Sequence, residues 1–227
     1  DGIASRGLGD VYKRQLIIRF DDTNPSKEKD EFVDNILLDC DILGLKADMV
    51  TYTSDSFQQI LEMGTRLIKE GSMYVDDTPM DKMREERINR IESVARTNSV
   101  ETNLKLWKHM IDGDQQGLKC AARFRMDMQN DNGALRDPVA FRCNLIPHHR
   151  TGTKYKVYPT YDCACPFVDA LEVRNSPHIN VPPLCFFSKK TNPCEHLFRL
   201  STSRVLRTPC VHLSTETVKH STAGYRN

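Results

Sequence analysis

The order of apolar and polar positions divides the chain into three regions. Between residues 16 and 172, short apolar runs alternate with segments whose apolar residues recur every three or four positions. The runs are typical of strands, and that spacing is typical of one buried helix face. Residues 1–15 and 173–227 sustain neither period. The pattern therefore predicts an ordered body between two poorly structured ends.

Residues 16–75 are predicted to form strand, helix, strand, helix and strand in that order. The strands are expected at residues 16–20, 49–52 and 73–75. Asn24 is expected to cap the first helix, with Pro25 at its first position, and Ser54 is expected to cap the second. Because strands and helices alternate, the pattern predicts a doubly wound parallel sheet.

Residues 76–157 follow a different pattern. Two helices are expected at 81–91 and 100–111, the second with Trp107 on its apolar, core-facing side. Alternating segments then predict strands near residues 118–128, 136–142 and 155–158. This order is typical of an antiparallel α+β unit, which we interpret as an insertion into the first domain. Residues 158–172 would return to that domain as a strand.

The first strand ends on two adjacent acids, Asp21 and Asp22, followed by Thr23 and Asn24. Two interpretations are open at this stage. Such side chains accept hydrogen bonds from nearby backbone N–H groups and therefore commonly form turns. Alternatively, ligands bind at the carboxyl ends of strands in open α/β sheets, where one acid would face a cationic group.

Charge is unevenly distributed, although the net charge is only +1. Residues 16–75 hold 6 basic and 12 acidic side chains, whereas residues 76–157 hold 15 basic and 12 acidic ones. The basic segment would suit contact with an RNA backbone. No apolar stretch approaches the roughly 20 residues of a membrane helix, so we expect no membrane partner.

The cysteines and histidines do not predict a metal site. Cys163 and Cys165 are one residue apart, with no matching pair and no His at zinc-site spacing. Free thiols in a reducing cytoplasm are therefore expected. His148 and His149 are adjacent, and in a strand they would face opposite ways, which does not suit a metal pair. We expect them in a loop or near the tRNA, and not as metal ligands.

Several motifs together resemble the class I glutamyl- and glutaminyl-tRNA synthetases in order and spacing. They are RFDDTNP at 19–25, YTSD at 52–55, RDPVAFR at 136–142, PHHRTG at 147–152, YPTYD at 158–162 and FVDALE at 167–172. The resemblance covers residues 16–172, and RFDDTNP is the form of the archaeal and eukaryotic branch. Residues 163–166 resemble the glutamyl rather than the glutaminyl enzymes, which remain the alternative.

The resemblance implies a partial Rossmann-like catalytic domain, formed by residues 16–75 and 158–172. Residues 76–157 would be the inserted domain that holds the tRNA acceptor end. In this family the carboxylate of L-glutamate attacks the α-phosphate of ATP, giving an aminoacyl-adenylate and pyrophosphate. The terminal adenosine of tRNA(Glu) then takes the aminoacyl group. ATP would thus be a substrate, accompanied by Mg²⁺, and no structural metal is implied.

The resemblance also implies roles for individual residues. Asp21 matches the acid that contacts the α-ammonium of the amino acid, a charge-assisted hydrogen bond. Tyr161 matches a tyrosine of the same pocket, with a half-buried strand aromatic as the alternative. Arg19 would join this glutamate pocket or pair with the two acids. Phosphate contacts with tRNA, or else surface ion pairs, are expected from Arg123, Arg125, Arg136 and Arg142.

The family's ATP-binding motifs, of His-Ile-Gly-His and Lys-Met-Ser-Lys-Ser type, do not occur in the sequence. The resemblance also breaks after Glu172. We therefore interpret the chain as an internal fragment that does not activate an amino acid by itself, with residues 1–15 a non-native leader and 173–227 a disordered, non-homologous tail. The alternatives are a non-enzymatic tRNA-binding fragment and a truncated product without a stable fold. Membership of the full-length parent in a multi-synthetase complex is left open.

Overall fold

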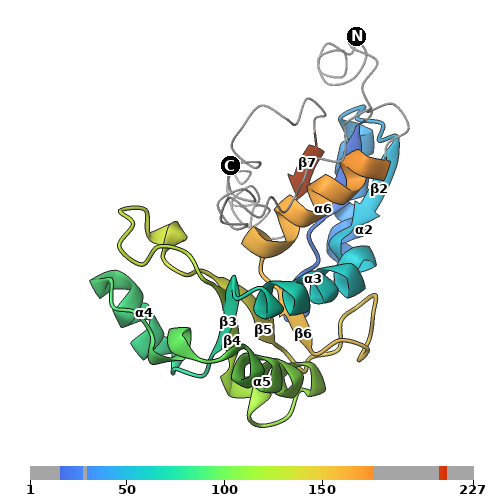
Figure 1. Cartoon of the computed structure of the whole chain (residues 1–227). Helices are drawn as coiled ribbons and strands as arrows, with labels where there is room; N and C mark the ends of the chain where they lie inside the picture. The colour runs from blue at the N-terminus through green and yellow to red at the C-terminus, as the bar shows by residue number, and fades with distance from the viewer. Residues whose placement is uncertain (1–15, 28–29, 176–209, 214–227) are drawn as a thin grey trace, which may run out of the picture.

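The computed structural model describes residues 16–27, 30–175 and 210–213 (Figure 1). These residues form two sheets, a three-stranded one of order β2-β1-β7 and a four-stranded one of order β3-β4-β5-β6. The mixed α/β prediction is therefore confirmed. In the part of the chain that the structure describes, none of the helices combines the length and the hydropathy of a bilayer-crossing segment.

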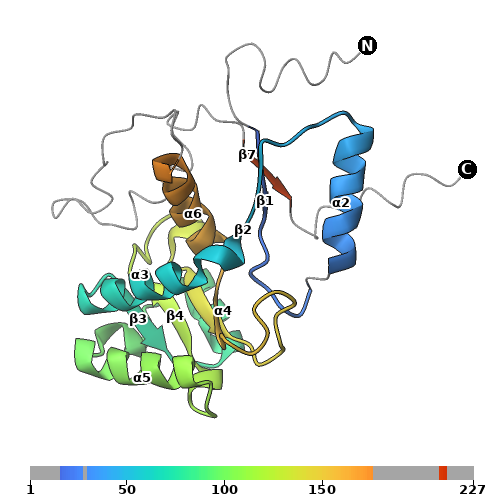
Figure 2. The ribbon, with the colours of Figure 1, turned by 90° about the vertical axis from the view of Figure 1, so that its right-hand side faces the viewer.

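The three-stranded sheet is parallel throughout. Strand β1 (Ile17–Phe20) pairs with β2 (Met49–Tyr52) on one side and with β7 (Cys210–Leu213) on the other. Helix α2 (Asp30–Ile42) lies between β1 and β2 in the chain (Figure 2). Its Ile36 belongs to a buried cluster with Ile18 and Phe20 of β1. The predicted parallel pairing of the first two strands is thus confirmed, and it brings their carboxyl ends to one edge.

The start of α2 differs from the prediction. Asn24 heads a turn and not the helix, because its carbonyl accepts from the amide of Lys27 at 3.0 Å and its side chain from that of Ser26 at 3.3 Å. Among the described residues, the helix runs from Asp30 to Ile42. Ser54 is likewise not the cap of the second helix, since it lies inside a 3₁₀ turn, η2 (Thr53–Ser56), that precedes it.

The four-stranded sheet is antiparallel between all its neighbours. It consists of β3 (Met73–Asp76), β4 (Ala121–Phe124), β5 (Val139–Cys143) and β6 (Val157–Pro159). The prediction that residues 73–75 form a third parallel strand is therefore wrong. All four residues of β3 are buried, and a strand that is buried on both faces carries no pattern that identifies its partner.

Four more helices complete the described body: α3 (Phe57–Lys69), α4 (Met80–Asn89), α5 (Val100–Asp112) and α6 (Tyr161–Asn175). The short 3₁₀ turns beside them are η3 (Val94–Thr97), η4 (Gly117–Lys119) and η5 (Gly133–Leu135). Ser99 caps α5 by accepting from the amide of Thr102, and Gly113 ends it at a φ of 65°. The helix predicted from 100 to 111 is thus confirmed.

The chain after β6 also differs from the prediction. The return segment is strand only as far as Pro159, and α6 begins at Tyr161. The carbonyl of Thr160 accepts from the amides of Cys163 and Ala164, which starts the helix directly after the strand. The prediction of a disordered tail does not hold for residues 173–175, which extend α6, or for residues 210–213, which form β7. Residues 1–15 and the rest of the tail lie outside the described residues.

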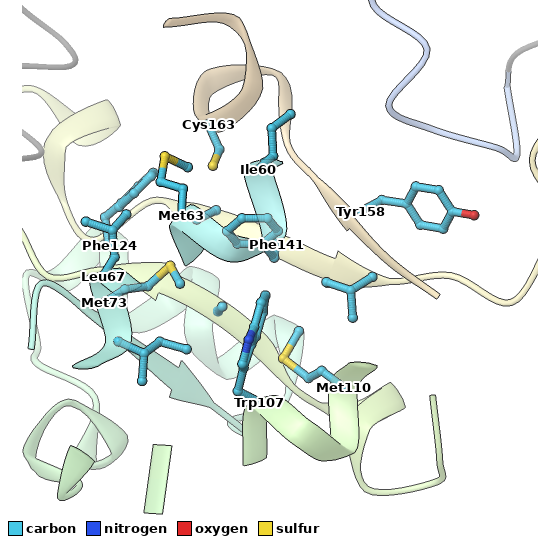
Figure 3. Packing of buried hydrophobic residues seen from close by; sticks show 14 of the residues in the cluster. Ile60, Met63, Leu67, Met73, Trp107, Met110, Phe124, Phe141, Tyr158 and Cys163 are labelled. Carbon is cyan, nitrogen blue, oxygen red and sulfur yellow. The ribbon is translucent and has the colours of Figure 1, made fainter. Parts of the chain in front are cut away.

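The main core lies between the antiparallel sheet and helices α3 and α5. Trp107 is 2% exposed, and its ring meets the ring of Phe141 edge-on at 5.1 Å between centroids (Figure 3). Gly64 of α3 allows this approach, because a Cβ there would lie 2.9 Å from Phe141 Cε2. The indole N–H donates to Thr65 Oγ1 at 2.9 Å. The prediction that Trp107 belongs to the core is confirmed.

Free thiols were expected, and the described cysteines agree. Those that the structure describes as free are Cys40, Cys120, Cys143, Cys163 and Cys165. Burial raises the pKa of the Cys120 thiol to about 11 and that of Cys143 to about 12. Both thiols are therefore protonated and weakly nucleophilic at neutral pH.

Truncation of Trp107 tests this packing. We expect Trp107→Ala to lower the free energy of unfolding by about 3–5 kcal/mol, because it removes a buried ring and leaves a cavity. Lys108→Ala, at an exposed position of the same helix, should change it by less than about 0.5 kcal/mol. Urea unfolding followed by circular dichroism measures both. Equal effects of the two substitutions would contradict the packing.

Candidate functional site

The two acids that follow β1 are buried and hydrogen-bonded. Asp21 is 6% exposed and Asp22 is 2% exposed. Asp21 Oδ1 accepts from Thr53 Oγ1, and Asp22 Oδ1 accepts from the amide of Ser54, both at 2.8 Å. Because β1 and β2 are parallel, the residues after both strands meet at one edge of the sheet. The Asp22 carboxylate thus accepts from a backbone N–H 32 residues away, and it fastens the two chain segments together instead of closing a turn of its own.

Arg19 is fully buried and connects β1 to α6. Its Nη2 lies 2.6 Å from Asp169 Oδ1, and its Nη1 lies 2.9 Å from Glu172 Oε2. Its Nε is 3.6 Å from Asp21 Oδ1, so the expected pairing with Asp21 is present. One cation thus faces three carboxylates.

Arg19 and Tyr161 were both predicted to contact glutamate. The two Nη groups of Arg19 are engaged by acids of α6, an arrangement that orients the acids around the strand end. Tyr161 is the first residue of α6 and not a strand residue, and it is 47% exposed. Contact of either side chain with glutamate stays a prediction.

The loop between β5 and β6 reaches the same place. His148 is buried, and its Nε2 lies 2.7 Å from the carbonyl oxygen of Asp22. A tight turn forms because the backbones of His148 and Gly152 exchange two hydrogen bonds. The rings of His148 and His149 stack at 4.5 Å between centroids. Both histidines lie in this loop, as expected, and not in a strand.

The side chains of Asp22, His148 and His149 place potential metal-ligating atoms within 4.8 Å of one another. The hydrogen bonds do not fit a metal at His148, however. Its Nδ1 accepts from the amides of Arg150 and Thr151, so its Nε2 carries the proton that it donates to the Asp22 carbonyl. A protonated nitrogen has no lone pair for a metal. The absence of a structural metal stays a prediction.

Arg150 completes the site from the solvent side. Its Nη1 donates to Ser54 Oγ at 2.6 Å and to Asp55 Oδ1 at 2.9 Å. Its guanidinium also lies over the ring of Tyr52, 3.7 Å from the centroid. The segments around Asp22, Ser54 and Arg150 therefore form one connected cluster at the carboxyl edge of the parallel sheet.

The sequence matches the family model described as tRNA synthetases class I (E and Q), catalytic domain, over residues 7–175. The chain belongs to this family. It is 56% identical over 170 residues to the cytoplasmic glutamate–tRNA ligase of Arabidopsis thaliana, covering 75% of this chain and 24% of that protein. It is 54% identical over 163 residues to the cytoplasmic enzyme of Saccharomyces cerevisiae, covering 71% and 23% respectively.

A bifunctional glutamate/proline–tRNA ligase of Mus musculus is 53% identical over 161 residues, which are 71% of this chain and 11% of that protein. The resemblance inferred from the motifs is thus confirmed. The chain spans about a quarter of the length of the monofunctional relatives it matches.

The arginines predicted to contact tRNA differ in their surroundings. Arg123 is fully buried, with Nη1 2.7 Å from Asp76 Oδ2 and Nε donating to the carbonyl of Asp137. It therefore cannot reach a phosphate in this structure, which corrects the prediction. Arg123 and Arg125 do share a face, since both lie beside the ring of Tyr74. That face is covered by the chain around Asp137.

Arg136 and Arg142 complete the set. Arg136 is half-buried, and its guanidinium donates to the carbonyls of Asn130 and Asp131, so it fixes a loop. Arg142 is exposed on β5. Of the four candidates, Arg142 is the one that the structure leaves exposed, and phosphate contact there stays a prediction. The periodicity of the sequence did not indicate that Asp76 and Asp137 would be the buried partners of Arg123.

The titration of Asp22 yields a testable pH dependence. Burial raises the pKa of Asp22, and the hydrogen bonds with Ser54 and the charge of Arg150 oppose that rise. Its Oδ2 accepts no hydrogen bond among the described residues. The folded state therefore binds this proton more tightly than the unfolded state. Protonated Asp22 therefore stabilises the folded state. This stabilisation is fully present below the pKa of Asp22 in the unfolded chain, about 3.9, and is lost as the pH rises through its pKa in the folded state.

Asp22→Asn cannot ionise, so we expect its stability relative to wild type to increase as pH is raised from 4 to 7. Asp114→Asn is the matched control with the opposite sign, because a hydrogen bond from the amide of Gly117 lowers the pKa of Asp114. Urea unfolding at a series of pH values measures both. A difference between Asp22→Asn and wild type that falls with rising pH would contradict the assignment.

Proposed function

We propose that this chain carries the amino-acid-binding part of a cytoplasmic glutamate–tRNA ligase. The proposed parent reaction joins L-glutamate to ATP, releasing pyrophosphate, and then transfers the glutamyl group to the acceptor end of tRNA(Glu). The observation that carries the proposal is the buried carboxylate of Asp21 at the end of β1, in a cluster where three acids surround one arginine. Such a site favours a ligand's ammonium group.

Two observations support glutamate as the amino acid. Relatives that are 48–56% identical are named as glutamate–tRNA ligases, including the two quoted above. Residues 163–166, Cys-Ala-Cys-Pro, lie near the start of helix α6, and Cys165 Sγ lies 3.4 Å from Arg19 Nη2. Residues of the segment that resembles the glutamyl enzymes are therefore in contact with the proposed pocket.

The partition of the chain follows from the same proposal. Residues 16–75 and 158–172 would belong to the nucleotide-binding catalytic domain, and residues 76–157 to the part that holds the acceptor end of tRNA. ATP, with Mg²⁺, would be the co-substrate of the whole enzyme. The exposed Arg142 on β5 is the proposed phosphate contact of this chain. The bifunctional relatives support a parent that works within a larger assembly of synthetases.

Binding of L-glutamate to the 227-residue chain tests the proposal. Calorimetric or NMR titration should detect binding to wild type, and Asp21→Asn should weaken it by about 10- to 100-fold, because a charge-assisted hydrogen bond contributes about 1.5–3 kcal/mol. The Asn side chain can still accept from Thr53, so the turn is retained.

Asp48→Asn is the matched control. Asp48 Oδ2 accepts from the amide of Leu16 at 2.6 Å, at the opposite end of β1, and its replacement should leave glutamate affinity unchanged. L-Glutamine should bind more weakly than L-glutamate to wild type. Unchanged affinity in Asp21→Asn, or no binding by wild type, would overturn the proposal.

A further inference from the structure

The PHHRTG segment at 147–152 has no role in the function proposed above. It lies in the loop between β5 and β6 of the antiparallel sheet, yet it contacts the turn after β1 in the parallel sheet (Figure 2). The contact spans 126 residues of sequence and joins the two sheets at the proposed amino-acid pocket. A long-range polar contact at that place calls for a specific explanation.

The ring of His148 is held on its faces and at both nitrogens. It stacks on Tyr158, with 5.9 Å between centroids, and meets Phe57 edge-on at 5.5 Å. Its Nδ1 accepts from the amides of Arg150 at 3.1 Å and Thr151 at 3.3 Å. These amides select the tautomer in which Nε2 bears the proton. The ring therefore has a fixed position, a fixed tautomer and one N–H directed at the carbonyl of Asp22.

The loop between β5 and β6 also contacts Ser54, the residue whose amide bonds the Asp22 carboxylate. The Ser54 amide donates to Asp22 Oδ1, and Arg150 Nη1 donates to Ser54 Oγ. The Asp22 residue is thus held at its carbonyl by His148 and at its carboxylate by Ser54. Asp21 precedes it directly, and its own carboxylate accepts from Thr53 of the same turn. The direction of the Asp21 carboxylate therefore depends on where these contacts place the backbone.

We propose that His148 is a positioning residue for Asp21, the acid that receives the α-ammonium group of the amino acid. This inference rests on the proposed function for its ligand. The imidazole supplies an acceptor for its own loop and a donor for the turn after β1. An apolar ring could not replace the imidazole. The amides of Arg150 and Thr151 would lose their acceptor, and the Asp22 carbonyl would lose its donor.

Two conservative variants test the hydrogen bonds of the two ring nitrogens separately. His148→Asn keeps an acceptor near the Nδ1 position and lacks a donor that reaches Asp22. His148→Gln keeps a donor near the Nε2 position and lacks the acceptor for the amides of Arg150 and Thr151. Amide hydrogen exchange, measured by NMR on the full chain, reports on each half, because Ser54 N–H monitors the Asp22 carboxylate.

A crossed pattern is expected. In His148→Asn the Ser54 amide should exchange about 10-fold faster than in wild type, whereas in His148→Gln it should stay within about 3-fold, since one hydrogen bond is worth roughly a factor of ten. The amides of Arg150 and Thr151 should show the reverse. The Val75 amide, bonded to Asn103 Oδ1 in the core, is the control for global stability and should be unchanged in both variants.

Glutamate affinity is the second readout. We expect His148→Asn to weaken L-glutamate binding about 10-fold, and His148→Gln to restore affinity to near the wild-type value. Equal Ser54 exchange in wild type and both variants would overturn the positioning role. Faster exchange at Ser54 and Val75 alike would also overturn it, because that is loss of global stability. A crossed exchange pattern without glutamate binding by wild type would support the positioning of the turn and reject the proposed function.

Discussion

The guanidinium of Arg19 is withdrawn from water in the middle of β1, where a charge would be strongly unfavourable without partners. Asp169 and Glu172 of α6 supply those partners, and Thr51 of β2 donates to the second oxygen of Glu172. Helix α6 follows directly from β6, so this one buried cation ties the parallel sheet to the end of the antiparallel sheet. The position of the acids at the strand end depends on this tie.

The turn after β1 is consequently fixed from three directions. The residues after β2 donate to both carboxylates, Arg19 approaches Asp21 from the strand, and His148 donates to the Asp22 carbonyl. Each of these contacts comes from a different element. A preorganised, electronegative strand end of this kind suits the recognition of an amino acid through its ammonium group. In the proposed parent enzyme, such positioning and charge stabilisation would account for much of the catalysis.

The parts that sequence predicted correctly are those governed by local patterns. The apolar run of β1, the acids at its end and the face of α5 that carries Trp107 all follow from short-range spacing. The errors are tertiary. The sheet partner of β3 was predicted wrongly, because a strand buried on both faces has no pattern that distinguishes parallel from antiparallel pairing. Arg123 was predicted at the surface, because alternation defines the face of a strand without showing what covers that face. The role of His148 depends on a turn closed at Gly152 and on an Asp22 carbonyl 126 residues away, which no spacing reveals.

The most direct test of this account is a double-mutant cycle between Arg19 and Asp169, measured by urea unfolding of Arg19→Met, Asp169→Leu and the combined variant. A single substitution leaves a buried charge without its main partner, and each is expected to cost about 3–5 kcal/mol. The combined variant should cost less than the sum, with a coupling energy of at least about 1.5 kcal/mol. Additivity within about 0.5 kcal/mol would contradict the claim that this buried pair holds the strand end and α6 together.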